Sequence, residues 1–139
     1  MKLELKKKIL IVEDDNIAAL VAEKTLEKHF SVTTVPNGHI AIKAVEMIRF
    51  DAVLMDINLG DHRLDGIATM HRIKSSTKNK RLKIFAITSF SDTRDFYINQ
   101  GFDDLITKPI LEEKATEVIN SKINNYVTGR SLFSKPKAA

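Results

Sequence analysis

Cysteine is absent from the 139-residue sequence. This absence excludes a disulfide framework, a cysteine-ligated zinc site and a cysteine nucleophile. No apolar run approaches the roughly 18 residues of a membrane-spanning helix. Residues 1–8 are basic but lack the apolar stretch of a secretory signal. These absences favour a cytoplasmic protein with no membrane partner, and the length agrees with one domain.

Excess positive charge is confined to the two ends of the chain. The net charge is +4; residues 1–8 and residues 127–139 carry +3 each, which leaves −2 on residues 9–126. The C-terminal stretch also loses its apolar periodicity, so we predict a domain over residues 1–126 and a flexible basic tail over residues 127–139. The central part has no basic stripe with interleaved aromatic residues, which argues against direct nucleic-acid binding.

Short apolar runs alternate with segments of helical periodicity. The runs that we interpret as strands are residues 8–12, 31–35, 51–55, 83–87 and 104–107. They show little alternation of polar and apolar side chains, which is typical of strands buried on both faces. Strands that alternate with helices predict an α/β fold, a doubly wound five-stranded parallel sheet with five helices.

The helical segments have apolar residues at a spacing of three or four. The predicted inward faces are Ile17, Leu20, Val21 and Leu26; Ile40, Ala41, Ala44, Val45 and Ile48; Ile67, Met70 and Ile73; and Leu111, Ala115, Val118, Ile119, Ile123 and Tyr126. The fourth helix, near residues 92–99, has a poor pattern.

Polar side chains follow four of the predicted strands. They are Glu13, Asp14 and Asp15, then Asp56, then Thr88 and Ser89, and finally Lys108. Ligands of doubly wound sheets bind beyond the carboxyl ends of the strands, so we expect these side chains to converge. Oxygen ligands without His or Cys suit Mg²⁺, and carboxylates, a cation, a hydroxyl and a lysine together form a site for phosphoryl transfer. Taken singly, each residue also has a structural explanation, such as acidic residues at a helix start; the coincidence favours a site.

These residues resemble the receiver domain of two-component response regulators. The motifs are Ile9 to Asp15, Pro36-Asn37-Gly38, Val53 to Leu59, Asp65-Gly66, Ile87-Thr88-Ser89, and Gly101 to Asp104 leading to Lys108-Pro109. They extend over residues 7 to about 126. The resemblance implies a flavodoxin-like fold with the strand order 2-1-3-4-5 and a cis peptide bond between Lys108 and Pro109.

The resemblance also implies a role for each residue at the strand ends. Asp56 is expected to accept a phosphoryl group. Asp14 and Asp56 would bind Mg²⁺ directly, Glu13 through a water molecule and Asn58 through its backbone carbonyl. Thr88 would bind a phosphoryl oxygen, and Lys108 would pair with Asp56 and then with the phosphoryl group. Asp15 is expected to begin the first helix instead.

The sequence departs from the family pattern at three places. The loop at residues 60–64 is longer than usual, and the stretch from Thr88 to Gly101 is shorter, which predicts a short fourth helix. Leu105 stands where the family usually has an aromatic residue that swings inward on activation. We therefore expect an altered readout through the fourth helix, fifth strand and fifth helix. We interpret the nearby aromatic residues as packing residues: Phe90, Phe96, Tyr97 and Phe102.

The predicted function is a phosphorylation-dependent signalling switch. A sensor histidine kinase or histidine phosphotransfer protein would phosphorylate Asp56 with Mg²⁺, changing binding to a downstream protein or to a second copy of the chain. The protein would not be an enzyme beyond its own phosphorylation and dephosphorylation. One alternative is a receiver-like interaction module that is never phosphorylated. A hydrolase of the haloacid dehalogenase type is disfavoured, because Asn58 stands where that chemistry needs a second Asp.

Overall fold

The apolar runs of the sequence form five parallel strands in the computed structural model, which describes residues 5–61 and 63–134, with side chains up to Ile123. The strands are β1 (Lys7–Val12), β2 (Phe30–Val35), β3 (Ala52–Asp56), β4 (Lys83–Thr88) and β5 (Asp104–Thr107). They pair in the order β2-β1-β3-β4-β5. The predicted fold class and strand order are therefore confirmed.

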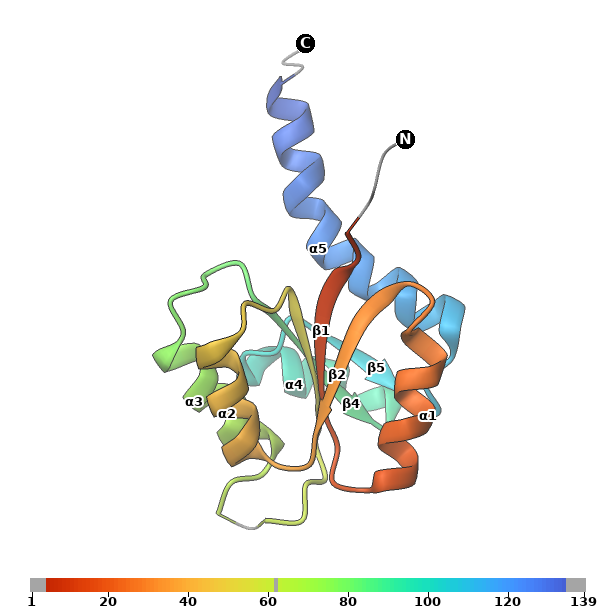
Figure 1. The fold of residues 1–139 in the computed structure, drawn as a ribbon, viewed down its shortest axis with the longest axis vertical. Helices are drawn as coiled ribbons and strands as arrows, with labels where there is room; N and C mark the ends of the chain where they lie inside the picture. Colours follow the sequence, from red (N-terminus) through yellow and green to blue (C-terminus); the bar gives the residue numbers. More distant parts are fainter. Residues whose placement is uncertain (1–4, 62, 135–139) are drawn as a thin grey trace.

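The segments between the strands form the helices that cover the sheet. They are α1 (Asn16–Leu26), α2 (Gly38–Met47), α3 (Gly66–Ser76), the 3₁₀ turn η1 (Ser91–Thr93), α4 (Arg94–Gln100) and α5 (Glu112–Ser134). Helices α2 and α3 cover one face, together with Tyr97 of α4, and α1 and α5 cover the other (Figure 1). Because both faces are covered, the central strands carry almost only apolar side chains.

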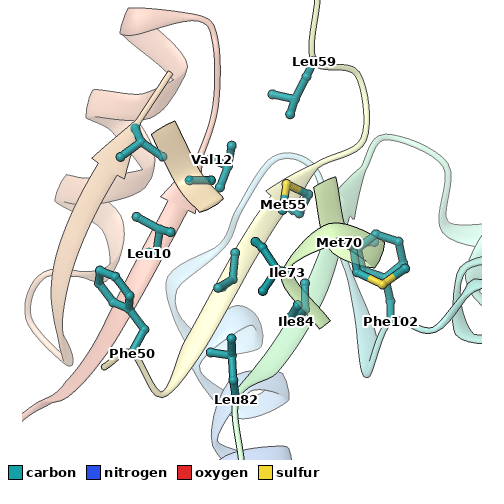
Figure 2. Packing of buried hydrophobic residues seen from close by; sticks show 14 of the residues in the cluster. Leu10, Val12, Phe50, Met55, Leu59, Met70, Ile73, Leu82, Ile84 and Phe102 are labelled. Atoms are coloured by element: carbon teal, nitrogen blue, oxygen red, sulfur yellow. The ribbon is translucent and has the colours of Figure 1, made fainter. Parts of the chain in front are cut away.

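Alternate residues of β1 belong to two separate hydrophobic cores, one on each face of the sheet. Leu10 and Val12 join the cluster beneath α2 and α3 that Figure 2 shows. Ile9 and Ile11 pack beneath α1 and α5 instead. Strand β2 differs from the expectation for a doubly buried strand, because it lies at the edge of the sheet and alternates between buried and exposed positions.

The prediction for the inward face of α1 was wrong for three of its four residues. Ile17, Leu20 and Val21 are exposed. The buried residues are Ala19, Ala22 and Leu26. Alanines on the inner face let the helix backbone approach the strands closely, which close packing favours. Hydrophobic spacing alone does not show which of two overlapping apolar stripes faces inward.

The other predicted faces are mostly confirmed. The buried members are Ala41 in α2, Met70 and Ile73 in α3, and Ala115, Ile119 and Ile123 in α5. The exceptions are exposed: Ile40, Ile48 and Leu111. In α2, Ile42, which the spacing did not predict, packs against the core together with the predicted Ala44 and Val45. The side chain of Tyr126 lies outside the described residues.

The fourth helix is short, as predicted. It ends at Gln100, and Gly101 has a φ of 123°, the left-handed region that favours glycine. Two basic side chains of α3 hold this end: His71 Nε2 lies 2.8 Å from the carbonyl oxygen of Gln100, and Lys74 Nζ donates to that of Gly101 at 2.5 Å. The C-terminal end of α4 is therefore anchored to α3, and the charged Lys74 lies where a helix dipole favours a cation.

Helix α5 continues past residue 126, where we predicted the domain to end. It runs from Glu112 to Ser134 and projects beyond the sheet (Figure 1). Once a helix has formed, further residues add to it without needing an apolar face, so the loss of apolar periodicity did not mark its end. Residues 135–139 of the predicted tail lie outside the described residues. Neither α5 nor any other described helix is long and apolar enough to cross a bilayer.

Substitutions at Leu26 and Leu20 test which face of α1 packs on the sheet. Leu26 is fully buried, whereas Leu20 is 54% exposed. We expect Leu26→Ala to lower the free energy of unfolding by about 2–5 kcal/mol, because it leaves a cavity. Leu20→Ala should change it by less than about 0.5 kcal/mol. Urea unfolding followed by circular dichroism measures both, and equal losses would contradict the observed packing.

Candidate functional site

Three carboxylates meet at the carboxyl edge of the sheet. Glu13 and Asp14 follow β1, and Asp56 is the last residue of β3. Strands β1 and β3 are neighbours in parallel register, with Val12 beside Met55, so the residues that follow these positions are brought together. Oxygen atoms of the three side chains lie within 4.8 Å of one another. The predicted convergence at this edge is therefore present.

Lys108 joins two of the three carboxylates. Its Nζ lies 3.1 Å from Asp56 Oδ2 and 3.7 Å from Glu13 Oε1. The lysine follows β5, and its backbone N–H donates to the carbonyl oxygen of Thr88 at 2.8 Å. This contact directs the chain past the end of β4 toward Asp56. The peptide bond between Lys108 and Pro109 is cis, as the resemblance predicts.

Backbone N–H groups hold the carboxylates in place. Asn58 N–H donates to Asp56 Oδ1 at 2.9 Å, and Gly60 N–H donates to Asp14 Oδ2 at 2.9 Å. Glu13 Oε2 accepts a hydrogen bond of 3.1 Å from the backbone of Asp15. Sequence reasoning missed the contribution of Gly60, because nearly every residue type has a backbone N–H and no side-chain signal marks this one.

Gly66 lets α3 begin directly against the end of β3. A Cβ at this position would lie 2.5 Å from the carbonyl oxygen of Asp56 and 3.0 Å from Ile57 Cα. Asp65 caps the helix by accepting a hydrogen bond from Ala68 N–H at 2.9 Å. The Asp65-Gly66 pair of the sequence therefore serves to seat α3 beside Asp56.

Thr88 lies between the acidic cluster and the start of α4. It is the last residue of β4 and is buried, and its Oγ1 accepts a hydrogen bond from Phe90 N–H at 3.3 Å. Its neighbour Ser89 is exposed. Asp15 stays outside the cluster and caps α1, accepting hydrogen bonds from Ile17 and Ala18, as expected.

Burial and neighbouring charges alter the pKa of two groups in the cleft. Burial, followed by a hydrogen bond with Asp56 and the charge of Asp56, raises the pKa of Glu13 to about 7. Partial burial alone would lower the pKa of Lys108, but its hydrogen bond with Asp56 and the charges of Asp56 and Glu13 outweigh burial and raise it. The lysine therefore stays charged, and the cleft favours a further cation.

The donor set of the cleft fits a hard divalent cation. Its three acidic side chains offer carboxylate oxygens, which suit Mg²⁺. The described histidines lie elsewhere on the surface. His29 lies 2.8 Å from Glu112, His39 lies 3.5 Å from Asp61, and His71 contacts α4. His62 lies outside the described residues.

Residues 9–120 match the response regulator receiver domain family. The chain belongs to this family. Family membership connects this receiver domain with phosphorylation-based two-component signalling.

Two curated proteins each contain a segment that is similar in sequence to this chain. Transcription factor SKN7 of Candida albicans is 32% identical over 118 residues, which are 83% of this chain and 20% of that protein. Sensor protein GacS of Pseudomonas syringae is 31% identical over 113 residues, which are 76% of this chain and 12% of that protein. The chain thus spans a small part of the length of these curated relatives.

Two solved structures have the same fold. A response regulator receiver domain from Methylobacillus flagellatus has 28% identity and a TM-score of 0.75, covering 84% of this chain and 98% of that one. The receiver domain of a sensor histidine kinase from Pseudomonas aeruginosa has 29% identity and a TM-score of 0.75, covering 86% and 98%. That structure holds a magnesium ion in its active-site cleft.

The receiver domain buries Leu105 where the family usually has an aromatic residue. Leu105 packs in the cluster beneath α2 and α3, as does Phe102. Tyr97 of α4 packs against the same cluster and makes an edge-to-face contact with Phe102. Phe90 and Phe96 are exposed. All four aromatic residues thus have packing or surface positions.

The raised pKa of Glu13 makes stability depend on pH. A carboxyl group whose pKa is raised from 4.5 to about 7 in the folded state contributes stability that is full at low pH and is lost as pH rises through about 7. We expect the free energy of unfolding in metal-free buffer to fall between about pH 5 and about pH 8. Glu13→Gln should flatten this fall, and Glu46→Gln, at an exposed position, should not. Urea unfolding across this range tests the idea, which a fall of undiminished size in Glu13→Gln would refute.

Proposed function

We propose that Asp56 accepts a phosphoryl group from a phosphohistidine of a sensor histidine kinase or histidine phosphotransfer protein. The observation that carries this proposal is the position of Asp56, only 2% exposed at the end of β3 with Lys108 at 3.1 Å. In the reaction a carboxylate oxygen forms a bond to phosphorus as the bond between phosphorus and the imidazole nitrogen breaks. The imidazole then leaves and keeps the electron pair of that bond.

The remaining residues of the cleft would assist this transfer. Mg²⁺ would be held directly by Asp14 and Asp56, through water by Glu13, and through a backbone carbonyl by Asn58. The ion would supply positive charge beside the phosphoryl oxygens. Lys108 would keep its charge and move its contact from Asp56 to the phosphoryl group. Positioning and charge compensation are the main contributions that a protein makes to such a transfer.

Thr88 is our candidate for sensing the phosphoryl group. Its hydroxyl would turn to donate to a phosphoryl oxygen and so release the N–H of Phe90, which it now accepts at 3.3 Å. Phe90 is tied to η1, since its carbonyl accepts Thr93 Oγ1–H at 2.6 Å. Because α3 anchors the other end of α4, the rearrangement would be concentrated in η1 and the first turn of α4. A downstream protein or a second copy would respond to that change.

The donor would dock beside the cleft, over α1. Ile17, Leu20 and Val21 form an exposed apolar patch on this helix. A cavity of about 250 Å³ joins the patch to the site, since its lining includes Val21 as well as Glu13 and Lys108. Exposed apolar patches of this kind commonly mark protein interaction sites.

Phosphorylation from a small donor tests the acceptor. Incubation with phosphoramidate and Mg²⁺ should add one phosphoryl group to the native chain, seen by intact mass, and EDTA should prevent it. Asp56→Asn should lose the addition completely. Asp15→Asn is the matched control, because Asn preserves the helix cap and leaves the cluster unchanged.

An equal addition in Asp56→Asn would refute the assignment of the acceptor. A chain that stays unmodified by both the small donor and a competent phosphohistidine protein, and that does not bind Mg²⁺, would favour the interaction module that is never phosphorylated.

The docking patch is tested by separating donor recognition from chemistry. We expect Leu20→Ser to slow transfer from a phosphorylated histidine phosphotransfer protein by roughly tenfold, because an apolar contact is lost on binding. Labelling by phosphoramidate should be unchanged. Ile48→Ser, an exposed apolar residue preceding β3, is the control and should leave both rates unchanged. Equal slowing with both donors would instead indicate damage to the cleft.

A further inference from the structure

A groove opens at the amino-terminal end of the strands, at the opposite end of the sheet from Asp56. It has a volume of about 470 Å³ and is lined by residues 45–50, which lead from α2 into β3, and residues 76–79, which follow α3. Figure 1 shows these connections at the upper end of the sheet, whereas the loop after β3 lies at the lower end. The groove is thus separated from the phosphorylation cleft by the length of the strands.

The groove has apolar side chains that the described chain leaves exposed. Phe50 is buried at its base and belongs to the core beneath α2 and α3. Met47 is 83% exposed and Ile48 is 42% exposed at the end of α2. Two large apolar side chains beside a groove provide a contact for an apolar side chain of a partner.

The rim of the groove is basic. Arg49 and Lys78 are among its lining residues, and the exposed Lys80 follows two residues after Lys78. Arg49, Lys78 and Lys80 form no ion pair with any carboxylate in the described part of the chain. Glu46 is the one acidic residue among those lining the groove. The rim therefore carries uncompensated positive charge.

One hydrogen bond of Asn79 joins the two sides of the groove, and two more hold Asn79 within its own segment. Asn79 Nδ2 donates to the carbonyl oxygen of Phe50 at 3.0 Å. Its Oδ1 accepts the N–H of Arg81 at 3.1 Å, and its own N–H donates to Thr77 Oγ1 at 3.1 Å. The groove is thus formed before any partner arrives, so little ordering opposes binding.

We propose that this groove binds an acidic segment of a partner protein that places an apolar side chain against Met47 and Ile48. Charge complementarity selects the acidic segment, since Arg49, Lys78 and Lys80 lack carboxylate partners. The apolar lip favours a peptide over a nucleic acid, because single strands bind by stacking on aromatic rings and the one aromatic residue lining the groove, Phe50, is buried. Because the groove and the cleft lie at opposite edges, the partner and a phosphoryl donor can bind together.

The test uses the full chain and short fluorescent peptides. One peptide contains Asp and Glu around a central Leu, a second replaces that Leu with Ser, and a DNA strand of equal charge is the third probe. We expect the Leu peptide to bind about tenfold more tightly than the other probes by fluorescence anisotropy. Amide shifts in an NMR titration should be centred on residues 47–50 and 76–79.

Two substitutions locate the contact. Lys78→Glu/Lys80→Glu should weaken binding of the Leu peptide by at least about fivefold, because it reverses charge on the rim. Lys24→Glu/Lys114→Glu, which makes the same change in net charge at exposed positions elsewhere, should have little effect. Met47→Ser should weaken the Leu peptide and not the Ser peptide.

Three outcomes would overturn the proposal. The first is that the Leu peptide does not bind. The second is that the control variant weakens binding of the Leu peptide as much as Lys78→Glu/Lys80→Glu does. The third is that the DNA strand binds more tightly than the Leu peptide and loses this binding in Lys78→Glu/Lys80→Glu. None of them depends on phosphorylation of Asp56, so this proposal can fail while the proposed function stands.

Discussion

Repulsion among Glu13, Asp14 and Asp56 is the constraint on which the cleft depends. Three carboxylates so close together destabilise the folded chain unless positive charge or protons compensate them. Lys108, the backbone N–H groups of the loop after β3 and the raised pKa of Glu13 provide that compensation. Because Lys108 reaches Asp56 only past the end of β4, the ion pair between them depends on the pairing of β3, β4 and β5.

Close packing of small residues explains how α1 and α3 are placed against the sheet. Ala19 and Ala22 bring α1 near the sheet, and Gly66 brings the start of α3 against Asp56. In α1 the inward alanines leave larger side chains on the outer face, although Leu26 also packs inward. The exposed Leu20 of α1 is one result, and it lies on the helix that Asp15 caps beside the cleft.

The two ends of the sheet have opposite chemistry. The carboxyl edge is acidic and suits a cation and a phosphoryl group, whereas the amino edge is basic around the groove at residues 45–50 and 76–79. Helix α5 also projects from the amino edge (Figure 1). The proposed phosphoryl transfer and the proposed partner would use opposite ends of the sheet and so would not compete for the same surface.

Three features could be predicted from the order of the residues alone: the fold class, the five strands, and the convergence of Glu13, Asp14, Asp56 and Lys108. Each of these follows from local order: apolar runs mark buried strands, and parallel strands bring the residues after them to one edge. Only the tertiary structure decided which stripe of α1 faces inward, because that depends on how closely the helix approaches the sheet. It also decided the hydrogen bond from Gly60 to Asp14 and the union of two distant loops into a basic groove, since backbone donors and contacts between distant segments leave no periodic signal in a sequence.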